Sequence, residues 1–71
     1  MSNPMVDTIT PVVTPQQQMA LAWRGFAKPE GKVTKSGVHV WTIRPDGQWV
    51  EAIGRDVNIA ITSLVREVAR P

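Results

Sequence analysis

The sequence predicts an α+β fold made of a short N-terminal helix, a three-stranded antiparallel β-meander and a C-terminal helix, preceded by an extended N-terminal arm. Strong turn signals divide the middle of the chain into segments that alternate between apolar and polar residues, and a helix-start signal precedes each flanking segment. A domain of 71 residues buries only about 60% of the surface of its unfolded chain. We expect a flexible arm over residues 1–13 and a single compact domain over residues 14–71.

Residues 1–13 contain prolines that oppose helix formation and apolar residues that show no clear period. Chain termini that nothing ties down are usually mobile, which favours a flexible arm. The segment nevertheless holds more medium-sized apolar residues than a solvating tail needs. An arm that docks on a partner through Val12 and Val13 is therefore the alternative.

Three agreeing signals mark the start of the first helix. Thr14 can cap it, Pro15 suits the first helical position, and Gln17 completes a capping box. The helix is expected from about Pro15 to Arg24, because Gly25 and then a Pro-Glu-Gly stretch favour a loop.

The spacing of three large apolar residues predicts which face of this helix packs on the rest of the domain. Met19, Trp23 and Phe26 stand at i, i+4 and i+7, which is the spacing of one helix face. In a small domain a tryptophan belongs more often to the core than to a binding surface. We therefore expect Trp23 in the core.

From Lys32 onward the hydrophobic period becomes two, which is typical of strands. The segment KVTK is followed by Ser36-Gly37, a two-residue turn signal, and then by VHVWTIR, which is rich in β-branched and aromatic residues. The next turn, Pro45-Asp46-Gly47, favours a three-residue loop with its glycine in the left-handed conformation. That loop predicts the cross-strand pairs Arg44–Gln48, Ile43–Trp49, Thr42–Val50, Trp41–Glu51, Val40–Ala52 and His39–Ile53.

This register gives the hairpin two largely apolar faces. One face carries Trp41, Ile43, Trp49 and Ile53 together with His39 and Glu51, and the other carries Val38, Val40, Thr42, Val50 and Ala52. Two short helices cannot easily cover both faces, and a glutamate opposite Trp41 indicates that the tryptophan face is not sealed at its middle. We expect one of Trp41 and Trp49 to be partly exposed.

The last segment, RDVNIAITSLVREVARP, is expected to form a helix that Asp56 caps. One stripe would pack this helix on the sheet, and it consists of Val57, Ile61, Leu64, Val65 and Val68. Residues 57–61 also alternate and are rich in β-branched side chains, so a fourth strand that leads into a shorter helix is the alternative.

Composition narrows the classes of function. The chain has no cysteine, which excludes disulfides and thiolate chemistry and fits a reducing compartment. It shows no signal-peptide pattern and no apolar run of membrane-spanning length, so we expect a cytoplasmic protein without membrane contact. A net charge of +2, spread along the chain, favours at most weak or indirect contact with nucleic acid.

The sequence shows no constellation typical of catalysis or metal binding. The single histidine, His39, has no second histidine or cysteine with which to hold a transition metal. Ser36 is explained as a turn residue, and GFAKPEGKV departs from the phosphate-binding loop in its glycine spacing and in its last residue. The acidic residues do not cluster as acid–base catalysis requires. We expect a protein that is not an enzyme and uses no cofactor.

Recognition of a partner remains, since tryptophan and arginine dominate the energetic centres of protein interfaces. Apolar positions would anchor the partner, and basic positions would steer the domain towards an acidic patch or nearby nucleic acid. The candidate partner-binding residues are Trp41, Trp49, Arg44, Arg24, Lys28, Lys32, Lys35, Val12 and Val13.

The string GVHVWTIRPDGQWVEAI is similar to the three-stranded sheet of the amino-terminal DNA-binding domains of phage and transposon integrases. In that family an Asp-Gly turn precedes a Trp-containing strand and a helix, and the resemblance covers about Lys32 to Ala69. It implies a small DNA-binding module whose sheet lies in the major groove. The present hairpin departs from the family because it offers only Arg44, with Lys32 and Lys35 on the preceding strand, for contacts with phosphates and bases.

The chain is short and free of cysteine, begins with the tail MSNPMVDTITPVV and is expected to have a compact α/β core. In these features taken together it resembles the small bacteriophage-encoded transcription regulators, of the Xanthomonas phage type, that bind host RNA polymerase. This resemblance implies a non-enzymatic inhibitor that interferes with promoter engagement by the sigma-containing holoenzyme, with a further influence on termination. A monomer is expected, whereas an antitoxin-like or structural subunit would form homo-oligomers through the exposed edge of the meander.

Overall fold

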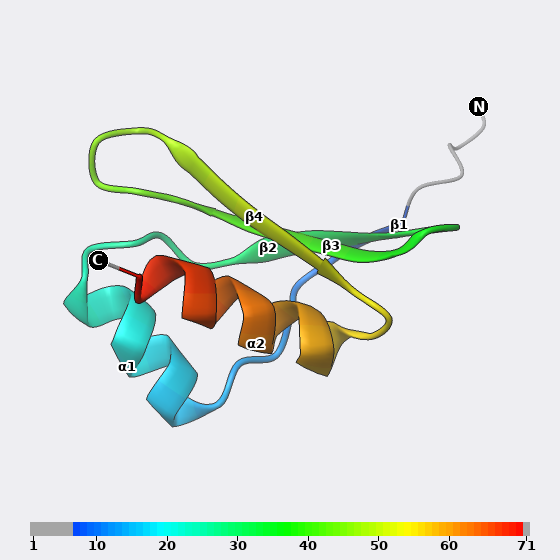
Figure 1. Cartoon of the computed structure of the whole chain (residues 1–71), viewed down its shortest axis with the longest axis horizontal. Coiled ribbons are helices and arrows are strands. Elements are labelled where there is room, and N and C mark those ends of the chain that lie inside the picture. The colour runs from blue at the N-terminus through cyan, green and yellow to red at the C-terminus, as the bar shows by residue number, and fades with distance from the viewer. Residues whose placement is uncertain (1–6, 71) are drawn as a thin grey trace.

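The computed structural model describes residues 7–70, and residues 1–6 and 71 lie outside this range. Its elements follow in the order β1 (Asp7–Ile9), α1 (Pro15–Trp23), β2 (Glu30–Thr34), β3 (Gly37–Ile43), β4 (Trp49–Gly54) and α2 (Val57–Val68). The strands form one antiparallel sheet in the order β1-β2-β3-β4, and both helices lie on the same side of it (Figure 1). The predicted α+β class is confirmed.

The sheet has four strands, so the prediction of a three-stranded meander was wrong. The additional strand, β1, lies in the segment expected to be an arm and pairs antiparallel with β2, with Ile9 opposite Gly31. Its three residues show no strand period of their own, because so short a strand is specified by the neighbouring edge that it completes. Residues 1–6 of the expected arm lie outside the described residues.

The β3–β4 hairpin has the predicted register at every pair. Its loop closes as expected: Gly47 has φ 93°, its amide donates to the Arg44 carbonyl (2.9 Å), and the Arg44 amide donates to the Gln48 carbonyl (2.8 Å). The β2–β3 turn lies one residue earlier than predicted, since Gly37 already begins β3 and pairs with Thr34.

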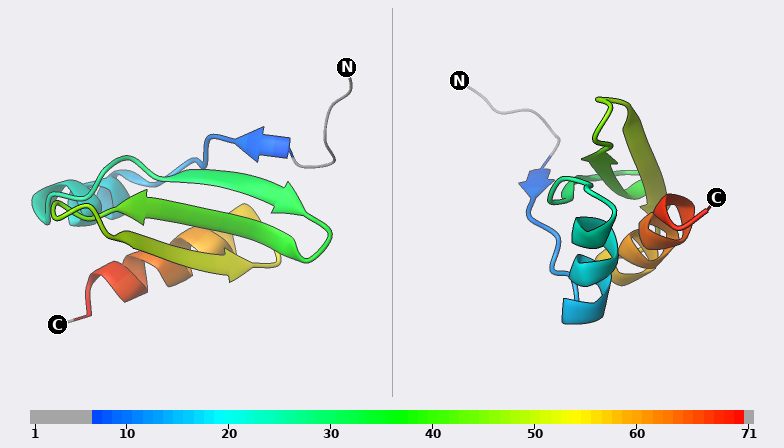
Figure 2. Two further views of the ribbon diagram at one scale, coloured as in Figure 1. Left: turned by 90° about the horizontal axis from the view of Figure 1, so that it is seen from above. Right: turned by 90° about the vertical axis from the view of Figure 1, so that its left-hand side faces the viewer.

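The hydrophobic core lies between α2 and one face of β3 and β4. Its buried members are Val38, Val40, Ala60, Ile61 and Leu64. Gly54 lets the helix approach β4 closely, since a Cβ atom at this position would lie 2.6 Å from the Ala60 nitrogen. The left panel of Figure 2 looks onto the other face of the sheet, where the strands lie in front and both helices lie behind them.

The helix α2 begins directly after Asp56, as predicted. The carboxylate of Asp56 accepts a hydrogen bond from the Ile59 amide (2.9 Å), which caps the helix. Residues 57–61 are therefore helical, and the alternative of a strand in this segment is excluded. Ile61, Leu64 and Val68 of the predicted stripe are buried, and its two other valines pack on the core.

The helix α1 begins as predicted, but the face expected to be buried is exposed. Thr14 and Gln17 form the capping box through hydrogen bonds of 3.1 and 2.9 Å. The Trp23 side chain, expected in the core, is 83% exposed, and Met19 is exposed as well. The buried residue of α1 is instead Leu21.

The way in which α1 ends places Phe26 outside the helix. Gly25 has φ 80° and its amide donates to the Ala22 carbonyl (3.0 Å), while the Phe26 amide donates to the Leu21 carbonyl (3.0 Å). These two bonds form a Schellman motif, which stops the helix before Phe26. Phe26 therefore does not belong to the helix, whereas Met19 and Trp23 do share a face of α1, and this face is exposed.

A buried threonine ties the loop after α1 to β3. Thr42 is 1% exposed, and its hydroxyl donates to the Ala27 carbonyl. The Ala27 amide in turn donates to the Ile43 carbonyl (3.0 Å). Both backbone groups of Ala27 are thus satisfied by β3.

Substitution Thr42→Val is expected to lower the free energy of unfolding by about 1–3 kcal/mol, because it leaves the Ala27 carbonyl without its donor. The control is Thr62→Val on the exposed side of α2, which is expected to change stability by no more than about 0.5 kcal/mol. Urea denaturation followed by circular dichroism measures both. Equal stabilities of the two variants would contradict a structural role for the Thr42 hydroxyl.

Candidate functional site

The helices leave one face of the sheet uncovered, and we call it the open face. Opposite residues in the strand pairs share a face, so the register assigns its members. The side chains that point to this side are Glu30 and Lys32 of β2 and every second side chain of β3 and of β4. The open face is defined within these three strands by Glu30, Lys32, His39, Trp41, Ile43, Trp49, Glu51 and Ile53.

Large apolar side chains on the open face are exposed to solvent. The Trp49 side chain is 61% exposed and that of Ile53 is 48% exposed, whereas Trp41 is half-buried. The prediction that one of Trp41 and Trp49 is partly exposed is therefore confirmed. The period-two pattern placed Ile53 on this face, but Ile53 was not among the predicted site residues. The signal that could have identified it as a site residue was that same pattern.

The centre of the open face is a shallow hollow of about 290 Å³. It is lined by Lys32, His39, Trp41, Trp49 and Glu51. Within residues 7–70 the one ion pair joins Arg70 and Glu67 (3.7 Å), so Lys32 and Glu51 are not paired there. The same residues hold no group of three histidine, cysteine or acidic side chains placed to bind a metal ion. The hollow thus combines aromatic surface with charges that are free to meet a partner.

The structure divides the predicted partner-binding residues among separate regions. Trp41, Trp49 and Lys32 meet on the open face. Arg24 and Arg44 lie at a second hollow, where the Arg44 guanidinium carbon is 5.8 Å from the centre of the Phe26 ring. The two other predicted lysines, Lys28 and Lys35, lie in the loop after α1 and in the β2–β3 turn.

Exposed apolar surface on α1 was not foreseen as a candidate site. The Arg24 guanidinium carbon lies 5.4 Å from the centre of the exposed Trp23 ring, within the range of a cation–π contact. This tryptophan belongs to α1 and not to the open face. It therefore serves below as a matched control for Trp49.

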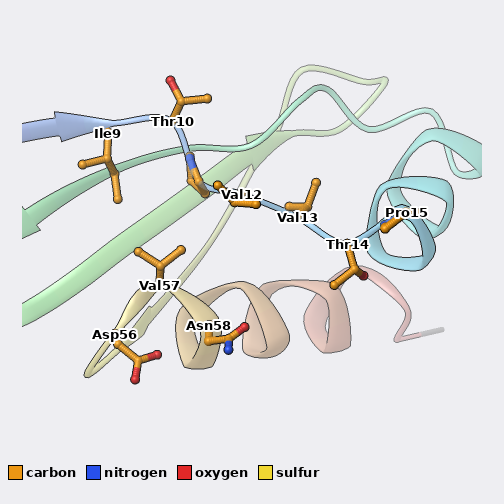
Figure 3. Close-up of a pocket in the computed structure, with 10 residues that line it drawn as sticks. Ile9, Thr10, Val12, Val13, Thr14, Pro15, Asp56, Val57 and Asn58 are labelled. Atoms are coloured by element: carbon orange, nitrogen blue, oxygen red, sulfur yellow. The ribbon is translucent and has the colours of Figure 1, made fainter.

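The remaining predicted residues, Val12 and Val13, lie between β1 and α1 and differ in environment. Val13 packs against the core, whereas Val12 is 85% exposed. Both line an open groove of about 850 Å³ between this segment and the start of α2. Figure 3 shows Ile9 and Val57 extending towards each other across the groove. Val13 is thus a structural residue and Val12 is an accessible one.

Substitution Val13→Ala is expected to lower the free energy of unfolding by about 1 kcal/mol, because it removes methyl groups that are partly withdrawn from water. Val12→Ala is the matched control and is expected to change stability by less than about 0.5 kcal/mol. Thermal unfolding of both variants measures the difference. A larger loss in Val12→Ala than in Val13→Ala would contradict the packing of this segment.

Comparisons with known proteins assign no family to the chain. No protein-family model matches it, and no curated protein or solved structure is significantly similar. Among residues 7–70 there is also no helix that combines the length and hydropathy needed to cross a bilayer. The surfaces of residues 7–70 are therefore the structural evidence that bears on function.

Proposed function

We propose that the chain is a non-enzymatic regulator that binds another protein through its open face. The observation that carries this proposal is the exposure of Trp49 and Ile53 on a sheet face that no described element covers. Burial of such groups in an interface gains roughly 25 cal/mol per Å² of apolar surface. Exposed apolar patches of this kind on small domains typically mark sites of interaction.

Bacterial RNA polymerase is the candidate partner, and the support for it is the resemblance of the whole chain to small phage-encoded regulators. In this proposal the bound domain interferes with promoter engagement by the sigma-containing holoenzyme and so inhibits initiation. An influence on termination follows if the domain stays bound during elongation. The basic residues outside the open face would steer the approach to an acidic surface of the enzyme.

The charges on the sheet support a protein partner in preference to DNA. On the open face Lys32 is accompanied by Glu51, and Glu30 of β2 lies on the same side opposite Trp41. Arg44 lies instead beside Phe26 at the second hollow. A sheet that entered the major groove would need cations directed at phosphates, and this face does not gather them.

Substitution Trp49→Ala is expected to weaken binding to RNA polymerase holoenzyme by about 10- to 30-fold, the loss typical of a truncated aromatic anchor. Trp23→Ala is the matched control, since it removes a tryptophan of α1 that is even more exposed than Trp49 and is expected to leave affinity unchanged. Isothermal titration calorimetry at low and high salt measures the affinities, and thermal unfolding checks that both variants are folded.

The salt dependence measured in this titration distinguishes a protein partner from DNA. Binding through the open face is expected to survive high salt, because apolar contacts dominate it. Duplex DNA serves as the second titrant, and its binding would fall steeply with salt through counterion release. Salt-sensitive binding to DNA alone, or equal polymerase affinities of the wild type and Trp49→Ala, would contradict the proposal.

The order of addition in a transcription assay tests the step that is inhibited. The protein is expected to lower the yield of promoter-dependent transcripts when it meets the holoenzyme before the promoter, and to have much less effect on preformed open complexes. Trp49→Ala is expected to lose this inhibition and Trp23→Ala to retain it. Equal inhibition in both orders would place the effect after promoter engagement.

A further inference from the structure

The sheet ends in two edges of different character. Within residues 7–70 the edge strand β1 has three residues, and so short a stretch offers little to a pairing chain. The other edge, β4, has six residues, and no described strand pairs with its outer side. The helix α2 packs behind the sheet and crosses β4 at an angle, and its C-terminal half extends past this outer side behind the strands (Figure 2, left).

The register shows which backbone groups point outward from β4. The Arg44 amide donates to the Gln48 carbonyl, so this pair of the hairpin is hydrogen-bonded. Hydrogen-bonded and non-hydrogen-bonded pairs alternate in an antiparallel ladder. The pairs that contain Trp49, Glu51 and Ile53 are therefore of the second kind, and their N–H and C=O groups point away from β3.

The same three residues carry their side chains on the open face. A strand added beside β4 would form hydrogen-bonded pairs with Trp49, Glu51 and Ile53, and its opposite residues would extend onto the open face. Two residues of the added strand would lie opposite the exposed apolar side chains of Trp49 and Ile53. The central one meets the Glu51 carboxylate, which has no ion-pair partner within residues 7–70.

A second copy of this chain fits the edge poorly. Of the symmetric antiparallel registers, one pairs all three outward residues, with Trp49 opposite Ile53 of the other copy. That register also sets Glu51 opposite Glu51 of the other copy. Like charges directly opposite each other on a sheet are destabilising, so the glutamate acts against self-pairing.

We propose that the outer edge of β4 accepts an extended segment of a partner protein as a fifth strand, with a lysine or arginine opposite Glu51 and an aliphatic residue opposite each of Trp49 and Ile53. The main-chain hydrogen bonds provide affinity and the alternate side chains provide specificity, as in other cases of strand addition. This inference rests on the proposed function, because it specifies how a partner meets the open face.

Synthetic peptides test the pairing directly. The peptide Thr-Val-Thr-Lys-Thr-Val-Thr presents valine, lysine and valine at alternate positions, and a peptide with glutamate at the centre is the matched control. The lysine peptide is expected to bind about fivefold or more tightly, since cross-strand charge pairs of opposite and like sign differ by about 1 kcal/mol or more. Amide chemical shifts in the ¹⁵N-labelled full chain measure the binding, and the amides of Trp49, Glu51 and Ile53 are expected to shift most.

Two substitutions of Glu51 distinguish selection of the peptide by charge from pairing through the backbone of β4. Glu51→Lys is expected to reverse the preference, so that the glutamate peptide binds more tightly. Glu51→Pro removes a central outward N–H without removing a hydrogen bond of the β3–β4 ladder, and proline is tolerated at such edge positions. It is expected to abolish binding of both peptides while the amide spectrum of the remaining residues stays folded.

The outcomes distinguish this inference from the proposed function. Polymerase binding that is lost in Trp49→Ala but kept in Glu51→Pro would retain the open face and overturn strand addition. Saturable peptide binding at the outward amides without polymerase binding would support strand addition and overturn polymerase as the partner. Peptide binding that ignores the central charge, shifts mainly other amides, or does not occur would overturn the inference.

Discussion

The packing of α2 against one face of β3 and β4 is the interaction on which the rest of the structure depends. Ile61 and Leu64 lie with Val38 and Val40 in the buried core, and Gly54 permits the close approach. Both helices are used on this side of the sheet, so the described chain has no element left to cover the other (Figure 1). Within residues 7–70 the open face is therefore the side of the sheet that neither helix reaches.

Local signals predicted those elements in which several kinds of evidence agreed. The β3–β4 register was predictable because turn chemistry and period-two patterning select the same pairs, and the helix starts were predictable because Thr14 and Asp56 cap them through their own side chains. The position of Trp23 was not, because hydrophobic spacing groups Met19 and Trp23 on one helix face but does not say whether that face or the one that carries Leu21 packs on the domain. Strand β1 was missed because only its pairing with β2 defines it.

Residues of the candidate site could be predicted from the sequence, but which of them lie together in the structure could not. The sequence showed two apolar faces on one hairpin, and nothing in Val40 or Trp41 says which face a helix will cover. That choice is made by tertiary packing, which favours the side where small residues such as Ala52 and Gly54 admit α2. The arginines were grouped with the tryptophans on composition alone, whereas the fold places Arg24 and Arg44 at a separate hollow.

The attachment of β1 has a consequence for how the domain assembles. The strands β2, β3 and β4 are joined by tight turns, whereas α1 lies within the connection between β1 and β2. Closing the longer loop loses more chain entropy, so we expect the meander and α2 to form first and β1 to join an edge that already exists. The β1 edge of the sheet is thus expected to form late in folding and the β4 edge early. In a nascent chain, β4 would be available to a partner before the N-terminal strand has paired with β2.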